Sequence, residues 1–116
     1  MLQENGFTAV GAGFLAEALR RSSSLTELVL GGNPLGDAGV ASLAEGLQTN
    51  RSLRTLNLNN TGFGEEGAEA LLQMLRVNTQ LATLSAKKVF DPEHAAAFRA
   101  AVQQLERPTP IELLLD

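Results

Sequence analysis

Leucines in this chain recur at a fixed interval of 28 positions. Within each interval a short stretch places leucine at every second position, as in Leu28–Leu30 and again in Leu56–Leu58. This period of two predicts a half-buried strand, because successive side chains of a strand point to opposite faces of the sheet. The leucines that repeat in this way are Leu25, Leu28, Leu30, Leu53, Leu56 and Leu58.

Between the strands, the apolar period lengthens to that of a helix. Apolar residues follow one another at offsets of 0, 3, 4 and 7, beginning at Val40 and again at Ala68, and this spacing produces an apolar stripe along one side of a helix. Residues Thr8, Asp37 and Asp91 precede such stripes and are predicted N-caps. The helices expected from this pattern run over residues 8–21, 37–49, 65–77 and 92–106.

A polar residue closes each strand, at Asn5, Asn33 and Thr61. Short polar side chains at such positions bond the turning backbone, so we expect this column to organise the turn. Glycines at positions 11, 39 and 67 recur once per repeat, which favours close packing between neighbouring units over a phosphate-binding loop.

The last repeat is one residue shorter than the others. A large apolar residue follows each turn, and Phe90 continues this column 27 positions after Phe63. One residue has therefore been lost near Lys87–Lys88. The same spacing leads to Ile111, Leu113 and Leu115 in the tail, which predicts a final strand within 108–116.

A strand-plus-helix unit repeated every ~20–29 residues is typical of a solenoid. Parallel strands joined by helical crossovers stack side by side, with the helices on one face. Each unit buries its apolar stripe against its neighbours, so the whole of 1–116 is expected to form a single domain. Its predicted units are residues 1–24, 25–52, 53–80 and 81–107, followed by the terminal strand 108–116.

Residues 24–47 carry the pattern SLTELVLGGNPLGDAGVASLAEGL. This pattern resembles the ribonuclease-inhibitor-like class of leucine-rich repeats, and most of all the repeats of NOD-like receptors. The resemblance implies an α/β fold: a right-handed leucine-rich-repeat solenoid, shaped as a short horseshoe arc with concave parallel strands and convex helices. The alternating cysteines of ribonuclease inhibitor are absent, since this chain has no cysteine.

Composition narrows the classes of function. The formal net charge of −4 argues against a nucleic-acid partner, which usually requires a basic face. The short apolar stretches argue against a membrane span, and with no signal-peptide pattern and no cysteine they favour a cytoplasmic protein. The sole histidine, His94, has no paired nucleophile and is interpreted as a surface or capping group. The pair Glu65–Glu66 is interpreted as complementing a helix dipole. We expect no catalytic residue, no cofactor and no metal site.

The outward residues of the predicted strands form three columns across the concave sheet, and we predict a protein-binding face there. The residues are small and mostly uncharged, and they lack the tryptophan and tyrosine that usually anchor interfaces. The pair Lys87–Lys88 adds local charge where the repeat is irregular. The predicted face comprises Glu27, Thr55 and Thr83, then Val29, Asn57 and Ser85, then Gly31, Asn59 and Lys87, with Lys88 at the edge.

The two ends of the array differ. The last helix is polar on its outer side, where Arg99 stands, as a terminal repeat should be. The first helix carries Phe14 where the next two repeats have Ser42 and Ala70. Either further repeats precede this segment in a longer protein, or the N-terminal face mediates self-association, because exposed apolar patches usually mark contacts.

These observations predict a non-catalytic protein–protein interaction module that presents a curved surface, ordered before binding, to a protein partner. Two alternatives follow from the resemblance. Ran GTPase-activating proteins share this repeat class, so a GTPase regulator is one. An actin-filament capping repeat of the tropomodulin type is the other.

Overall fold

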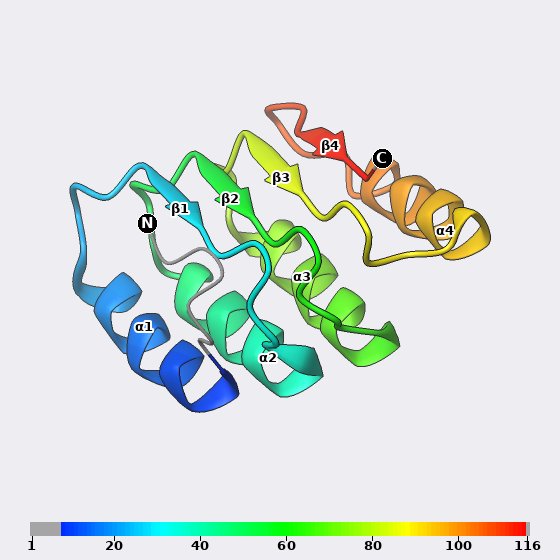
Figure 1. Ribbon diagram of the computed structural model, residues 1–116. Coiled ribbons are helices and arrows are strands. Elements are labelled where there is room, and N and C mark those ends of the chain that lie inside the picture. Colours follow the sequence, from blue (N-terminus) through cyan, green and yellow to red (C-terminus); the bar gives the residue numbers. More distant parts are fainter. Residues whose placement is uncertain (1–7, 116) are drawn as a thin grey trace.

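The computed structural model describes residues 8–115. Helices and strands alternate strictly along this part of the chain, as the repeat predicts (Figure 1). In chain order the elements are α1 (Ala9–Arg21), β1 (Glu27–Val29), α2 (Gly36–Leu47), β2 (Thr55–Asn57), α3 (Glu65–Val77), β3 (Thr83–Ser85), α4 (Pro92–Gln103) and β4 (Glu112–Leu114).

The described strands form one parallel sheet in the order β1-β2-β3-β4. The strands lie along one side of the molecule, while the helices form a layer on the other (Figure 1). Consecutive strands are therefore neighbours, and each helix is the crossover between two of them. This confirms the predicted α/β solenoid architecture and the terminal strand. The strand that Asn5 was expected to close lies outside the described residues.

The inward assignment of the strand leucines is confirmed. Leu56 and Leu58 have no exposed surface, Leu30 has none, and Leu28 is also buried. They pack against the buried apolar stripes of the helices. Leu43 belongs to the stripe of α2, and α1 and α3 carry equivalent apolar residues. The core is thus a single continuous layer between sheet and helices.

Helix boundaries agree with the sequence prediction within a few residues, but Asp37 does not cap its own helix. The helix α2 begins one residue earlier, at Gly36, and its N-cap is Leu35. The Asp37 carboxylate instead accepts hydrogen bonds from the backbone N–H groups of Gly64 and Gly67, each at 2.7 Å. It therefore caps the N-terminus of α3 in the following repeat, where an anion also complements the helix dipole.

The helix α4 ends at Gln103, three residues before its predicted end at 106. The backbone reaches the left-handed region at Glu106, with φ of 52°, and such a residue terminates a helix. At the other end, the predicted N-cap Asp91 is confirmed, because its side chain accepts from the backbone N–H of His94 at 2.8 Å. Thr8 is the N-cap of α1 by position, without a side-chain bond.

The first three helices pack closely. A Cβ added at Gly46 of α2 would lie 2.6 Å from the Ala16 carbonyl oxygen of α1, so only glycine permits this approach. A Cβ at Gly39 would lie 3.3 Å from the Ala9 Cα of α1, and one at Gly67 would lie 3.0 Å from the Asp37 carboxylate of α2. Close packing between neighbouring units is therefore the role of Gly39 and Gly67, two of the three glycines in the predicted column.

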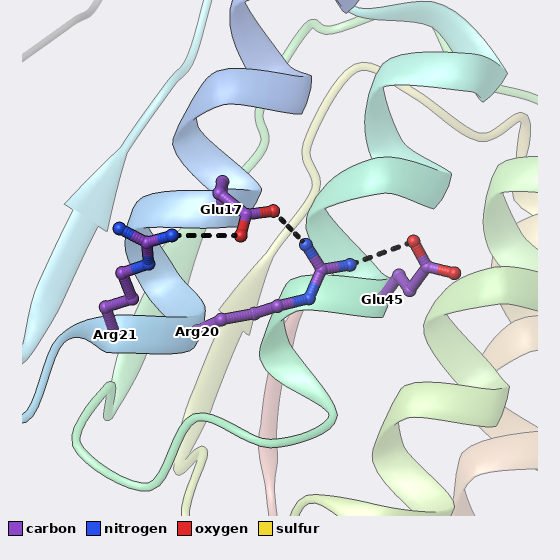
Figure 2. Close-up of polar contacts among 4 residues, drawn as sticks. All are labelled: Glu17, Arg20, Arg21 and Glu45. Carbon is purple, nitrogen blue, oxygen red and sulfur yellow. Dashed lines mark hydrogen bonds and ion pairs between the residues drawn. The ribbon is translucent and has the colours of Figure 1, made fainter.

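A surface ion-pair network also joins α1 to α2 (Figure 2). The Arg20 guanidinium lies 2.7 Å from a Glu17 carboxylate oxygen and 3.0 Å from one of Glu45, and Arg21 lies 3.8 Å from the second Glu17 oxygen. Exposed pairs of this kind contribute at most about 1 kcal/mol each. The network tightens the register of α1 on α2 but does not determine it.

The turn after each strand is organised as predicted. The Asn33 side-chain amide donates to the Leu30 carbonyl at 2.9 Å, and the Thr61 hydroxyl donates to the Leu58 carbonyl at 2.7 Å. Both residues are buried. The third member of this column, Asn5, lies outside the described residues.

We expect Asn33→Ala to lower the free energy of unfolding by about 1–3 kcal/mol, because it leaves buried backbone groups without their partner. Thr61→Ala should cost less, since a hydroxyl satisfies fewer groups than an amide. Urea denaturation followed by circular dichroism measures both losses. Equal and negligible losses would show that this column does not organise the turn.

A second polar column, which the sequence analysis missed, lies at the opposite turn, between helix and strand. Asn50 donates to the Leu19 carbonyl of the preceding repeat at 2.8 Å and accepts from the Leu53 N–H at 2.8 Å. Asn78 repeats this arrangement on the next pair of turns, with Leu47 and Leu81 as partners at 2.7 and 2.9 Å. Each asparagine thus joins two consecutive repeats.

Arg107 completes this column at the C-terminal end. Its guanidinium donates to the carbonyls of Leu75 and Leu81, at 3.1 and 2.6 Å, and to that of Asn78. Burial lowers the pKa of Arg107 from its ordinary value, although an arginine remains charged near neutral pH. The 28-residue spacing from Ser22 to Asn50 to Asn78 was the sequence signal for this column.

Candidate functional site

The strand register places the predicted outward columns side by side on the sheet. Glu27 pairs with Thr55 and Thr55 with Thr83, while Val29, Asn57 and Ser85 form the adjacent column. The sheet continues both columns onto β4, at Glu112 and Leu114. These two positions were missed because the repeat spacing changes before the last strand. The predicted columns are therefore neighbours in space, as expected.

The column at the strand exits is held by a chain of hydrogen bonds. The Asn59 side-chain oxygen accepts from the Ser85 hydroxyl at 2.6 Å and from the Lys87 backbone N–H at 2.7 Å. The Asn57 side-chain oxygen in turn accepts from the Asn59 N–H at 2.9 Å. A Cβ at Gly31 would lie 3.3 Å from the Asn59 carbonyl oxygen, so the backbones at Gly31 and Asn59 lie close together.

The predicted residues differ in how much surface they offer. The prediction of contact is wrong for two of them. Gly31 and Ser85 are buried, so they hold neighbouring residues in place and do not offer a surface to a partner. The half-buried and exposed positions remain candidates for contact. They are Glu27, Val29, Thr55, Asn57, Asn59, Thr83, Lys87 and Lys88.

His94 and Asp91 form an exposed pair at the start of α4. The His94 Nδ1 lies 2.8 and 2.9 Å from the two Asp91 carboxylate oxygens. Hydrogen bonds from the His94 backbone and then its side chain lower the pKa of Asp91, and the bond to Asp91 raises the pKa of His94. Each partner favours the charged form of the other, which makes the pair a reinforced helix cap. Within residues 8–115, no group of three or more histidine or carboxylate side chains is arranged to hold a metal ion.

A groove between α3 and α4 is a further surface feature, and sequence reasoning did not anticipate it. Its volume is about 420 Å³, and a second hollow of about 410 Å³ continues it along the same two helices. The two hollows share Leu72 and Ala101. Figure 1 shows α4 standing apart from α3, in contrast to the close row of α1, α2 and α3. The helix layer therefore opens at this one place among the described repeats.

The groove has a steric origin in three phenyl rings. Phe63 meets Phe90 edge-on, with ring centroids 5.5 Å apart, and Phe90 stacks on Phe98 at 5.1 Å. These rings fill the end of the space between the repeats. Farther along, α4 presents small residues, including Ala97 and Ala101, which leave the space open.

Comparison with known proteins agrees with this architecture. A family profile described as Leucine Rich repeat matches residues 21–44 and 49–72, two stretches that begin 28 residues apart. No curated protein sequence matches the chain. Among solved structures, one titled "Leiomodin-1 Actin-Binding Site 2 (ABS2)" matches 99% of this chain and 68% of its own, with a TM-score of 0.84 and 18% identity. The chain folds as a leucine-rich-repeat solenoid.

Two stretches of this solenoid are thus leucine-rich repeats in sequence as well as in structure. The structural match at 18% identity concerns the fold, and it extends over nearly all of the chain. Among the helices of residues 8–115, none is both long enough and apolar enough to cross a membrane.

Proposed function

We propose that this leucine-rich-repeat chain is a non-catalytic, cytoplasmic protein-interaction module of the ribonuclease-inhibitor-like class, which binds a protein partner on the sheet. The observation that carries the proposal is the order of the sheet surface. Asn57, Asn59 and Ser85 fix one another by hydrogen bonds of 2.6 to 2.9 Å before any partner arrives. A surface ordered in advance loses less conformational entropy on docking.

The chemistry of this face favours a polar protein surface as its partner. Threonine and asparagine side chains dominate its middle. Glu27 and Glu112 place negative charges on the two edge strands, and Lys87 places a positive charge after β3. Hydroxyl and amide groups both donate and accept hydrogen bonds, so they can pair with backbone and side-chain groups of a partner. This arrangement of charges would set the orientation in which that partner docks.

Actin is the second candidate partner, and one observation favours it. The solved structure that matches nearly the whole chain is titled as an actin-binding site of leiomodin-1. This supports the actin-capping alternative, because fold similarity of this extent allows a similar surface shape. The side chains on the surface differ at most positions, since 18% are identical.

A pair of matched substitutions tests the binding face. We expect Thr55→Arg, in the middle of the sheet, to weaken retention of the partner by roughly tenfold or more, because a long charged side chain there separates the two surfaces. Gln73→Arg introduces the same side chain at an exposed position of α3, on the helix side, and should leave retention unchanged. Circular dichroism checks that both variants are folded.

The partner is measured in two ways, by retention of purified monomeric actin on the immobilised chain and by mass spectrometry of proteins retained from a cell extract. Actin retained by the parent and lost with Thr55→Arg supports the actin candidate. A small GTPase with that behaviour would instead support the regulator alternative. If Thr55→Arg and Gln73→Arg retain every partner equally, the sheet is not the binding face and the proposal is wrong.

A further inference from the structure

The proposed binding face leaves the outer side of α1 unused. Val10 is 73% exposed and Phe14 is 76% exposed, although both are large apolar residues. They are four residues apart and therefore lie on the same side of the helix. A phenyl ring and an isopropyl group held together in water usually mark a contact. The same helix ends in two basic residues, Arg20 and Arg21.

The groove between α3 and α4 has the complementary character. Its apolar lining includes Ala68 and Leu72 of α3 and Ala97 of α4. The carboxylates of Glu65 and Glu69 line the α3 side of the groove, near the N-terminal end of that helix. On the α4 side the groove is lined by Asp91 and His94, which are paired with each other. Clefts of ~300–1,000 Å³ accommodate sizeable ligands, so about 420 Å³ is ample for an aromatic side chain.

The spacing of apolar and charged groups is the same on both surfaces. Phe14 and Arg21 are separated by seven residues, and so are Glu65 and Leu72. Seven residues make two helical turns, or about 10 Å, so each pair lies on one side of its helix. When α1 is laid antiparallel to α3, Phe14 reaches Leu72 while Arg21 reaches Glu65. Glu17 lies on the same side of α1 and comes opposite Glu69, and its charge is balanced by the ion pair with Arg20, at 2.7 Å. The antiparallel direction also aligns the two helix dipoles favourably.

We infer that the outer face of α1 docks antiparallel into the α3–α4 groove of a second copy of this chain. The contact cannot form within one molecule, because α1 and α4 occupy opposite ends of the helix layer (Figure 1). It joins two different surfaces, so it is heterologous, and the docked pair still has one free α1 face and one free groove. The association therefore continues beyond a dimer, and it leaves the sheet face of every copy open.

Sedimentation velocity from micromolar to millimolar concentration tests this inference. The parent chain should show reversible association into a series of species larger than a dimer. Phe14→Ser should weaken it by roughly tenfold or more, since a central aromatic anchor is lost. Val77→Ser removes another exposed apolar side chain, 58% exposed on α3, and should leave association unchanged. A parent that stays monomeric throughout would overturn the inference.

A second pair of variants tests the groove without touching the core. Ala97 is exposed and lines the groove, so Ala97→Arg fills it with a charged side chain and should abolish association. Ala96→Arg is the matched control, because Ala96 is exposed on the same helix but is not part of the groove lining. Association that survives Ala97→Arg would mean that the groove is not the acceptor.

Mixing the two defective variants distinguishes this contact from every symmetric one. Phe14→Ser keeps an intact groove, and Ala97→Arg keeps an intact α1 face. Each should be monomeric alone, while the mixture should form a one-to-one dimer that grows no further. A symmetric contact between two α1 helices predicts instead that Ala97→Arg dimerises alone and that Phe14→Ser stays outside that dimer, and this result would refute the inference. Thr55→Arg on the sheet should associate like the parent, so the outcome is independent of the proposed partner-binding face.

Discussion

Leu56→Ala is expected to lower the free energy of unfolding by about 2–5 kcal/mol. Leu56 has no exposed surface, and its strand β2 lies between β1 and β3, where it pairs in register with Leu28 and Leu84. Truncation removes buried methyl groups and leaves a cavity. The repeats on its two sides cannot both move inward to fill it. A domain of this size is stabilised by only about 5–15 kcal/mol, so the loss is a large part of the total.

Urea denaturation followed by circular dichroism measures this loss. Val77→Ala is the control, because Val77 is 58% exposed and its truncation removes methyl groups from water-accessible surface. It should change stability by less than about 0.5 kcal/mol. If Leu56→Ala and Val77→Ala unfold at the same urea concentration, the inward assignment of the strand does not describe the protein in solution.

Asn78→Ala is expected to cost about 3 kcal/mol or more. The buried side chain donates to the carbonyls of Leu47 and Asn50, at 2.7 and 3.0 Å, and accepts from the backbone N–H groups of Gln80 and Leu81, at 2.8 and 2.9 Å. Alanine replaces none of these bonds, and each buried group left without a partner costs about 1–3 kcal/mol. The partners belong to two consecutive repeats, so the loss also uncouples them.

The same denaturation experiment ranks Asn78→Ala against Gln73→Ala. Gln73 is an exposed amide whose side chain donates to Glu69 on the surface of α3, at 3.1 Å, so its loss should be a few tenths of a kcal/mol. A loss at Asn78 as small as that at Gln73 would show that water or a neighbouring side chain replaces its bonds. We expect Asn78→Ala to exceed Asn33→Ala as well, because the Asn78 side chain joins separate turns.

The predicted outward positions do form columns on the sheet, as the strand register shows, but the sequence did not predict how far each side chain is exposed. A strand position fixes which face of the sheet a side chain takes, because the period of two is local. Whether that side chain then reaches solvent depends on its neighbours. Ser85 lies on the predicted face but is buried, since the Asn59 side chain of the adjacent strand covers and binds its hydroxyl. No spacing in the sequence records that contact.

The sequence by itself determined the repeat, the order of helices and strands, and the side of each element that enters the core. These follow from local periodicity and from the cost of leaving leucines such as Leu56 and Leu58 in water. It also determined the N-cap at Asp91 and the turn column at Asn33, where donor and acceptor are within three residues of each other.

The tertiary structure alone decided how neighbouring repeats approach one another. Asp37 caps the helix of the next repeat, Asn50 and Asn78 each bind across a repeat boundary, and Gly46 permits contact between two backbones. The α3–α4 groove arises where two neighbouring helices do not approach closely, because the rings around Phe90 fill the space at one end. Partners in these contacts are about 30 residues apart along the chain, and their distance depends on the packing of whole elements, which a local pattern does not specify.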